Sequence, residues 1–318
     1  MAHKIVIADC DHNDIDIEKV ILSENGLDCD WRKCITEDEL IKGCTDASVL
    51  IIQYAKVTRR VMEKLPDLKL VIRYGVGYDT VDVPAAMELG IEVCNVPDYG
   101  TNEVADHALA HTLCLLRKLY KTNSDIRSGE WNFISTMPIR RINCLTVGVI
   151  GFGRIGKQYA KRMEAFGAKI IAYDVREVEA PSYVSLVSFD ELLSASDIIS
   201  IHCPADNNLN LIGEKEFESM KDGVYLINVS RGGIIDEEAL DNALSSGKVA
   251  GCGLDVALKE PLPSNHPLLR HENLTVSPHM AWYSEDSAQE LKRKVALEAT
   301  RFVKGESVLY SVITNSTN

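Results

Sequence analysis

The chain has 318 residues, of which 46% are hydrophobic, so it is long enough for about two domains with a large buried core. Its 47 acidic residues outnumber its 34 lysines and arginines and give a formal net charge of −13, which argues against partners such as nucleic acid or an anionic membrane. No apolar run approaches the roughly 18 residues that cross a bilayer, and the N-terminus does not read as a secretory signal. The nine cysteines stand singly, without a CxxC pair, so we expect a reducing, cytoplasmic environment.

The first hundred residues alternate strands with helical stretches. Apolar runs predict strands over 4–9, within 46–53, from 68 into the Gly-rich loop that ends at 79, and over 91–97. Residues 15–25 are typical of a helix. This alternation indicates an open parallel sheet with helices on both faces. A long helix is expected next over 102–121, and because it is mostly apolar it needs a partner surface, which predicts a homodimer.

A strand–helix–strand unit with a glycine-rich turn occupies residues 146–174, TVGVIGFGRIGKQYAKRMEAFGAKIIAYD. Gly151 permits a tight turn, Gly153 lets the backbone approach a pyrophosphate, and Gly156 lets the helix pack close to the sheet. The helix N-terminus offers unpaired N–H groups to the phosphates. Asp174 ends the second strand, where a carboxylate can bind the ribose hydroxyls and would repel a 2′-phosphate. The unit therefore predicts dinucleotide binding and favours NAD over NADP.

This unit begins a second series of strands in the middle of the chain. Further strands are expected over 197–203, 223–229, 249–256 and 273–278, and a last helix over 286–304. We therefore predict an α/β protein in which a Rossmann dinucleotide-binding domain, residues 101–284, is inserted into a smaller flavodoxin-like α/β substrate-binding domain. The smaller domain comprises 1–100 plus 285–318. Ligands are expected in the cleft between the domains, at the carboxyl ends of the strands.

Three segments that follow strands of the second series carry reactive side chains. They are NVSRGGIID with Arg231, LDVALKEP with Asp255 and Glu260, and SPHMAWYS with His279 and Trp282. An arginine can clamp a carboxylate or carbonyl in fork geometry. A histidine can shuttle a proton near neutral pH, and a carboxylate beside it favours the charged imidazole. The set indicates acid–base chemistry on an oxygen-bearing substrate.

With these segments the chain resembles the D-2-hydroxyacid dehydrogenase family over nearly its whole length. The matching motifs are GFGRIG at 151–156, NVSRGGIID at 228–236, Asp255 to Pro261 with its Glu-Pro, and the Pro-His of 278–279. RYGVGYDTVD, VCNVP and HMAWYSEDS look most like the C-terminal binding protein branch, which includes animal corepressors that keep the dehydrogenase fold and bacterial relatives.

The resemblance implies roles for individual residues. Arg231 would polarise the substrate, His279 would be the acid/base, and Glu260 would be its partner. The implied substrate-binding residues are Arg73, Gly75, Val76, Gly77 and Trp282. The implied cofactor-binding residues are Gly151, Phe152, Gly153, Arg154, Ile155, Gly156, Asp174, His202, Cys203, Pro204, Val229, Ser230 and Asp255. For Asp255 a packing role is equally open.

Two further patterns carry weaker predictions. Glu103, His107 and His111 share one helical face at a spacing that could hold a metal, but we expect no metal because this helix is a dimer-interface element in the family. The segment 203–213 lacks the Leu-Thr and Thr residues usual in the family, so its cofactor geometry stays open. The loop IRRINCLTVG lacks the usual glycine pair, and Asn143 is expected to take the strained turn.

The sequence thus predicts an NAD-dependent oxidoreductase that transfers a hydride between nicotinamide and C2 of a D-2-hydroxy acid or 2-keto acid, mainly in the reductive direction. One alternative is an NAD(H)-sensing scaffold like the corepressors, although the complete Arg–Glu–His set is not needed for scaffolding. Another is a short D-3-phosphoglycerate dehydrogenase, which needs cations for the phosphate. The substrate stays open: Tyr54 and Trp282 suit an apolar side chain, whereas Arg59 or Arg60 could meet a charged one.

Overall fold

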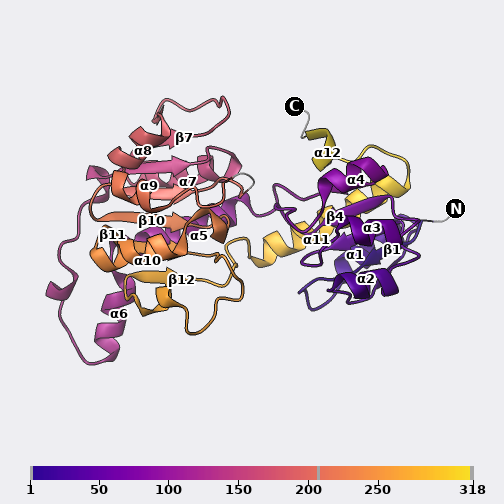
Figure 1. Cartoon of the computed structure of the whole chain (residues 1–318), viewed down its shortest axis with the longest axis horizontal. Helices are drawn as coiled ribbons and strands as arrows, with labels where there is room; N and C mark the ends of the chain where they lie inside the picture. The colour runs from indigo at the N-terminus through magenta and orange to yellow at the C-terminus, as the bar shows by residue number, and fades with distance from the viewer. Residues whose placement is uncertain (1–2, 206–207, 316–318) are drawn as a thin grey trace. The chain divides into compact units, whose positions relative to one another are not determined.

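The computed structural model describes residues 3–205 and 208–315, and Figure 1 shows the course of the chain. The chain divides into two compact units. Unit 1 consists of residues 1–100 and 284–318, and unit 2 of residues 101–283. Among the described residues, no helix combines the length and the apolarity needed to cross a membrane.

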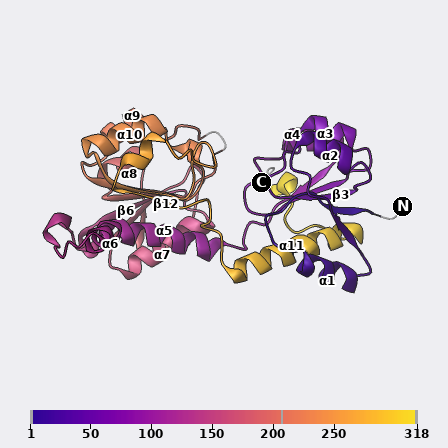
Figure 2. The same ribbon diagram turned by 90° about the horizontal axis from the view of Figure 1, so that it is seen from below.

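Unit 1 is a five-stranded parallel sheet in the order β2-β1-β3-β4-β5. Its strands are β1 Ile5–Ile7, β2 Cys29–Trp31, β3 Val49–Ile52, β4 Leu70–Arg73 and β5 Glu92–Cys94. Its helices are α1 Asp16–Glu24, α2 Glu37–Gly43, α3 Arg59–Lys64, α4 Val83–Leu89, α11 Glu285–Val303 and α12 Val312–Asn315. Figure 2 shows α1 and α11 on one face of the sheet and α2, α3 and α4 on the other. Because both faces are covered, the inner strands β1, β3 and β4 are buried and apolar up to Arg73, the last residue of β4.

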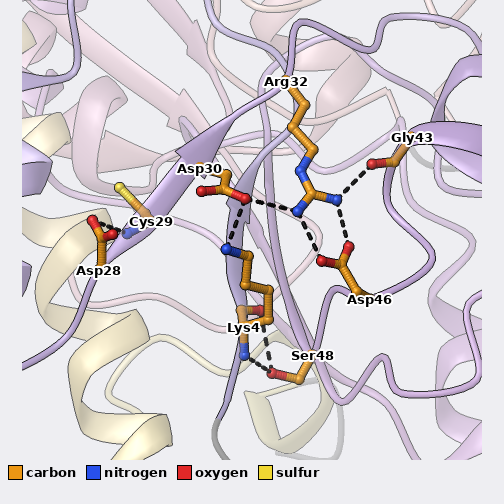
Figure 3. A network of polar contacts seen from close by, with 8 residues as sticks. All are labelled: Lys4, Asp28, Cys29, Asp30, Arg32, Gly43, Asp46 and Ser48. Atoms are coloured by element: carbon orange, nitrogen blue, oxygen red, sulfur yellow. Dashed lines mark hydrogen bonds and ion pairs between the residues drawn. The ribbon is translucent and has the colours of Figure 1, made fainter.

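Charged side chains protect the exposed edge of this sheet at β2 (Figure 3). The Asp30 carboxylate accepts hydrogen bonds from Lys4 Nζ at 2.7 Å and from Arg32 Nη2 at 2.8 Å. Arg32 also donates to the carbonyl oxygen of Gly43 at 2.6 Å and to the Asp46 carboxylate. The hydrogen bond from Arg32 lowers the pKa of Asp46 to about 2. Fixed charges on an edge strand disfavour pairing with another chain.

We predict that Arg32→Ala lowers the free energy of unfolding by about 1–2 kcal/mol, because it leaves a carbonyl and two carboxylates without their shared donor. The measurement is the midpoint of urea denaturation. Arg59→Ala is the matched control: Arg59 pairs with Glu88 on the exposed surface, where an ion pair contributes little. Equal shifts for the two variants would contradict the prediction.

Unit 2 is a seven-stranded parallel sheet in the order β12-β11-β10-β9-β6-β7-β8. Its strands are β6 Thr146–Ile150, β7 Lys169–Tyr173, β8 Val184–Leu186, β9 Ile198–Ile201, β10 Val224–Asn228, β11 Val249–Leu254 and β12 Leu274–Val276. Its α-helices are α5 Thr101–Leu116, α6 Leu119–Arg127, α7 Arg154–Ala165, α8 Phe189–Ala195, α9 Glu214–Ser219 and α10 Glu237–Ser246. The chain order reverses between β6 and β9, and such a switch point opens a crevice at the carboxyl ends of the strands.

Two local predictions are wrong. The single helix expected over 102–121 is broken, because α5 ends at Leu116 and Lys118 adopts a left-handed conformation with φ 51° before α6 begins. Leu115 and Leu116 are the last residues of α5 that reach the core, and α6 has no buried residue. Asn143 does not take a strained turn. It lies in a short 3-10 helix, Ile142–Cys144, which redirects the chain without a positive φ.

Candidate active site

The turn between β6 and α7 has the shape of a dinucleotide cradle. Gly151 has φ +89°, and a Cβ there would lie 2.7 Å from the backbone nitrogen of Cys203. A Cβ on Gly156 would lie 2.1 Å from the carbonyl oxygen of Gly151. Gly153 is the N-cap of α7 without a side-chain cap, and the nearest atom to a Cβ there is 3.9 Å away. Packing therefore requires glycine at 151 and 156, whereas Gly153 leaves the helix N-terminus open to a phosphate.

A cavity of about 400 Å³ lies beside this turn, and its lining includes Phe152, Arg154, Lys157, Arg176 and Val178. Three of these side chains are cationic, which suits the phosphates of a dinucleotide, and two carboxylates, Glu177 and Glu179, complete the charged part of the lining. Ile155, the neighbour of Arg154 in the first turn of α7, is partly buried.

Asp174 follows β7 at the rim of the same region. Its carboxylate accepts hydrogen bonds from the backbone nitrogens of Phe152 at 2.9 Å and Arg176 at 3.0 Å, and it pairs with the Arg176 guanidinium at 3.2 Å. Burial acts to raise the pKa of Asp174, but the bonds from Arg176 and Phe152 outweigh it and lower the pKa. The carboxylate is therefore ionised at neutral pH and fixed in place.

His202, Cys203 and Pro204 follow β9 on the other side of the switch point. His202 is partly buried, and desolvation of its ring lowers its pKa to about 3, so the imidazole is neutral. Its Nε2 bonds with Ser200 Oγ at 2.8 Å, whereas its Nδ1 is buried and lacks a hydrogen-bond partner among the described residues. Such an atom fits a polar ligand group. The altered segment 203–213 includes residues 206–207, which lie outside the described residues.

The loop after β10 carries Val229, Ser230 and Arg231. Ser230 Oγ donates to the carbonyl oxygen of Ile201 at 2.9 Å, which joins this loop to the end of β9. Arg231 Nη1 donates to the carbonyl oxygen of Ser230 at 2.8 Å. A Cβ on Gly232 would lie 1.9 Å from the carbonyl carbon of Ala257. Only glycine lets this loop press against the loop after β11.

The loop after β11 supplies Glu260, which contacts His279. The distance from His279 Nδ1 to Glu260 Oε2 is 2.6 Å, and Glu260 Oε1 accepts a hydrogen bond from the backbone nitrogen of Ala257 at 3.0 Å. Burial acts to raise the pKa of Glu260, but the bond with His279, the Ala257 N–H and the charge of Arg231 lower it overall. The structure thus brings Arg231, Glu260 and His279 together at one edge of the sheet.

The turn that carries His279 is held by Asp255. His279 has φ 53°, a conformation rare for residues with a side chain, and its backbone nitrogen donates to the carbonyl oxygen of Asp255 at 2.8 Å. The Asp255 carboxylate, only 1% exposed, accepts hydrogen bonds from the backbone nitrogens of Met280 at 2.9 Å and Ala281 at 2.8 Å. Both of its oxygens are occupied by this turn. Trp282, half-buried, follows and packs edge-on against Tyr283.

The remaining candidates lie in unit 1, after β4. A Cβ on Gly75 would lie 1.7 Å from Arg73 Nη1, so glycine lets the guanidinium lie over the backbone of this loop. Gly75 has φ +132°. The side-chain amide of Asn95 donates to the carbonyl oxygen of Val76 at 2.6 Å, and Gly77 is partly exposed. The loop Gly75–Gly77 is thus fixed beside Arg73.

Sequence reasoning missed two acidic residues beside this loop, Asp9 and Asp11. The Asp9 carboxylate accepts hydrogen bonds from the backbone nitrogens of Gln53 at 2.9 Å, Tyr54 at 2.6 Å and Ala55 at 3.1 Å. Burial raises the pKa of Asp9, against these bonds and the charge of Arg73. The Tyr54 hydroxyl donates to Asp11 at 2.7 Å. An acid directly after the apolar strand β1 was the signal available in the sequence.

The two arginines considered for a charged substrate point elsewhere. Arg59 pairs with Glu88 of α4 at 2.5 Å, and Arg60 pairs with Glu37 and Asp38 of α2 at 3.2 Å and 2.6 Å. Both guanidinium groups therefore join helices on the surface of unit 1.

The helical face of Glu103, His107 and His111, which the sequence offered as a metal site, makes other contacts. Within residues 3–205 and 208–315, no group of three or more His, Cys, Asp or Glu side chains could hold a metal ion. His107 and His111 instead bond with hydroxyl groups of Thr275 and Ser277.

Comparison with known proteins identifies the family. Residues 109–281 match the model of the D-isomer specific 2-hydroxyacid dehydrogenase NAD binding domain. The chain is 36% identical over 296 residues to D-3-phosphoglycerate dehydrogenase of Archaeoglobus fulgidus, with 92% of this chain but 56% of that protein covered. It is 35% identical over 309 residues to hydroxypyruvate reductase of Blautia hydrogenotrophica, with 89% of this chain and 95% of that protein covered.

Solved structures give the same result. D-lactate dehydrogenase from Aquifex aeolicus, complexed with NAD and lactic acid, superposes with a TM-score of 0.86 at 31% identity, covering 95% of this chain and 96% of that one. A glyoxylate reductase from Paecilomyes thermophila superposes with a TM-score of 0.88 at 31% identity and 99% coverage of both chains. These findings confirm the predicted family, the fold of two parallel-sheet α/β units and the NAD cofactor. The chain belongs to the D-isomer specific 2-hydroxyacid dehydrogenase family and is an NAD-dependent oxidoreductase.

Proposed function

We propose that this chain acts mainly as a 2-keto acid reductase, with unit 1 as the substrate-binding domain and unit 2 as the NAD-binding domain. The observation that carries the proposal is the 2.6 Å contact between His279 and Glu260, at the same edge of the unit 2 sheet as the glycine turn. The relatives named hydroxypyruvate reductase and glyoxylate reductase support the reductive direction.

In this proposal His279 is the acid/base. Its Nδ1 is engaged by Glu260, so its Nε2 gives a proton to the C2 oxygen in reduction and takes it back in oxidation. The ionised Glu260 accepts the hydrogen bond from Nδ1–H and fixes the orientation of the ring. Arg231 polarises the C2 oxygen, and Arg73 binds the substrate carboxylate. NAD, when bound, supplies or accepts the hydride.

The residues proposed for NAD are those around the glycine turn. Gly151 to Gly156 and the N-terminus of α7 would hold the pyrophosphate, and Asp174 the adenosine ribose. His202, Cys203, Pro204, Val229 and Ser230 line the opposite side of the switch point. We assign Asp255 to the support of the His279 turn rather than to direct contact with NAD, because its carboxylate oxygens are occupied.

We propose a short 2-keto acid that carries no charge beyond its carboxylate, such as glyoxylate or hydroxypyruvate, as the substrate. Asp9 and Asp11 both form hydrogen bonds with Tyr54. The charge of Arg73, the residue proposed for the substrate carboxylate, acts on the pKa of Tyr54. Arg59 and Arg60, the cations that a phosphate tail would need, are paired with acids on other helices. A phosphate carries close to two negative charges at neutral pH, so the short D-3-phosphoglycerate dehydrogenase alternative is less favoured.

A finer placement in the C-terminal binding protein branch is also proposed, on the combination of Arg73 and Trp282. Within that branch we favour an enzyme over an NAD(H)-sensing scaffold, because Glu260 and His279 form a complete acid–base pair. All nine cysteines are free thiols, which supports a reducing, cytoplasmic location.

We further propose a homodimer, although not through the helix first considered. The apolar side chains of α5, such as Ala108 and Leu115, are buried in unit 2 itself. The segment 119–137 instead exposes a run of large apolar side chains, namely Leu119, Ile126, Trp131, Phe133, Ile134 and Met137. An exposed apolar surface of this kind is typical of an interface, and a second copy of the chain is the proposed occupant.

We predict that NADH is oxidised with glyoxylate or hydroxypyruvate, and that kcat/KM for phosphohydroxypyruvate is at least about tenfold lower, because acids surround the loop of Tyr54. Pyruvate, 4-methylthio-2-oxobutyrate and phenylpyruvate complete the panel of substrates to be measured.

We predict that His279→Ala lowers kcat by about 10²–10⁴-fold while NADH still binds. Normal turnover in that variant would remove His279 from the mechanism, and NADH binding without turnover on any substrate would favour the scaffold.

We predict that Asp174→Asn lowers the preference for NADH over NADPH. The amide keeps an acceptor for the Phe152 N–H but loses the charge that repels a 2′-phosphate, and Arg176 remains to meet that phosphate. The measurement is kcat/KM for both cofactors. Glu177→Gln, which removes a carboxylate from the same cavity, is the control, and an unchanged cofactor ratio in Asp174→Asn would argue against the assigned role.

We predict that light scattering gives twice the mass of one chain, and that the double variant Trp131→Glu/Phe133→Glu gives the mass of one chain, because charges on the exposed apolar run oppose its burial. Val175→Glu is the control, since Val175 is also an exposed apolar residue of unit 2 but lies outside the segment. A monomeric wild type, or a double variant that stays dimeric, would refute the proposed surface.

A further inference from the structure

Two histidines of α5 lie under the loop that carries His279. His107 and His111 are one helical turn apart, with their ring centroids 4.9 Å apart in an edge-on arrangement. His111 is buried at 8% exposure. A Cβ on Gly253 would lie 2.7 Å from His111 Cβ, so glycine in β11 makes room for this side chain. The proposed mechanism gives neither histidine a role.

Both histidines bond with the hydroxyl group of Ser277. The distances to Ser277 Oγ are 2.7 Å from His107 Nε2 and 3.1 Å from His111 Nε2. Ser277 Oγ in turn donates to Asp255 Oδ1 at 2.6 Å. A serine hydroxyl has one hydrogen and two lone pairs, so these three contacts use its whole hydrogen-bonding capacity.

The protonation state of His111 fits these hydrogen bonds of Ser277. Burial lowers the pKa of His111 to about 4, with His107 acting in the same direction and Asp255 against it, so the ring is neutral. Its Nδ1 lies 2.7 Å from Thr275 Oγ1. A neutral ring has one donor and one acceptor nitrogen. Ser277 gives its one hydrogen to Asp255, so Nε2–H of His111 must donate to Ser277. Nδ1 is then the acceptor, and Thr275 donates to it.

The chain of bonds ends at the His279 turn. Ser277 and Met280 both donate to Oδ1 of Asp255, and Ala281 donates to Oδ2. These bonds offset the cost of the left-handed backbone at His279, which is unfavourable for a residue with a Cβ. A shift of the Asp255 carboxylate would move the backbone on which the His279 imidazole is mounted.

We propose that His107 and His111 are positioning residues for His279, acting through Ser277 and Asp255. They fix the hydroxyl of Ser277, which fixes the Asp255 carboxylate, which holds residues 279–281 in place. This inference rests on the proposed role of His279 as the acid/base. It makes α5, a helix that carries no catalytic residue, part of the geometry of proton transfer.

The test compares Ser277→Ala, Ser277→Thr and His111→Leu with the wild type and with His279→Ala. Ser277→Thr keeps the hydroxyl. His271→Leu is the matched control, because His271 is another largely buried histidine of unit 2, and its Nε2 lies 2.7 Å from Asp241. For each variant, kcat and KM are measured with glyoxylate or the best panel substrate, together with the dissociation constant of NADH and the pH profile of kcat.

Ser277→Ala and His111→Leu are expected to lower kcat by about tenfold or more, since small displacements of a catalytic group are costly. The NADH dissociation constant should stay close to that of the wild type, and the pH profile of kcat should shift because the contact of His279 with Glu260 changes. Ser277→Thr should retain most of the wild-type kcat and its pH profile. His271→Leu should leave both unchanged.

A wild-type kcat and pH profile in Ser277→Ala and His111→Leu, alongside an inactive His279→Ala, would overturn the positioning role and leave the proposed function standing. An active His279→Ala would instead overturn the proposed function. If His271→Leu lowers kcat by the same factor, the loss of kcat reflects general destabilisation of unit 2, and this result would also overturn the positioning role. If Ser277→Ala does not fold, His107→Ala, at a half-buried position, decides by the same readouts.

Discussion

A buried carboxylate needs hydrogen-bond donors, because a charge left unpaired in the interior costs several kcal/mol. Asp255 meets this demand with Ser277 and with the backbone N–H groups of Met280 and Ala281. These donors come from one short stretch of chain, so satisfying the charge also fixes the backbone of His279. The contact between His279 and Glu260 depends on that fixed backbone, and with it the chemistry proposed for unit 2.

Unit 1 uses the same device. Asp9 follows β1 and accepts the backbone N–H groups of Gln53, Tyr54 and Ala55, which come from the loop after the neighbouring strand. Asp174 does likewise for Phe152 after β7. In each case an acid at the carboxyl end of a parallel strand binds a loop that leaves an adjacent strand. The edge of the sheet where ligands are expected is thereby made rigid by the side chains of its own strands.

The parts of the fold that could be predicted from the sequence are those with strong local patterns. The run from Val147 to Asp174 combines apolar strands with glycines at tight turns. A Cβ at Gly156 would lie 2.1 Å from a backbone oxygen, so only glycine fits there. The edge strands β2 and β8, with the sequences CDW and VSL, were missed because they are three residues long and half exposed. The roles of Asp9 and Ser277 depend on donors far away in the sequence, and no local pattern reports such a pairing.

The break at Lys118 has a consequence for how the molecule behaves on dilution. Helix α6 has nine residues, none of them buried, and a helix of this length is marginal in water by itself. Under the proposed dimer, its order is supplied by whatever covers the neighbouring apolar side chains. Folding of this segment and association of two chains then form a single equilibrium, and the amides of α6 would exchange with solvent at a rate that depends on protein concentration, while those of the central strands would not.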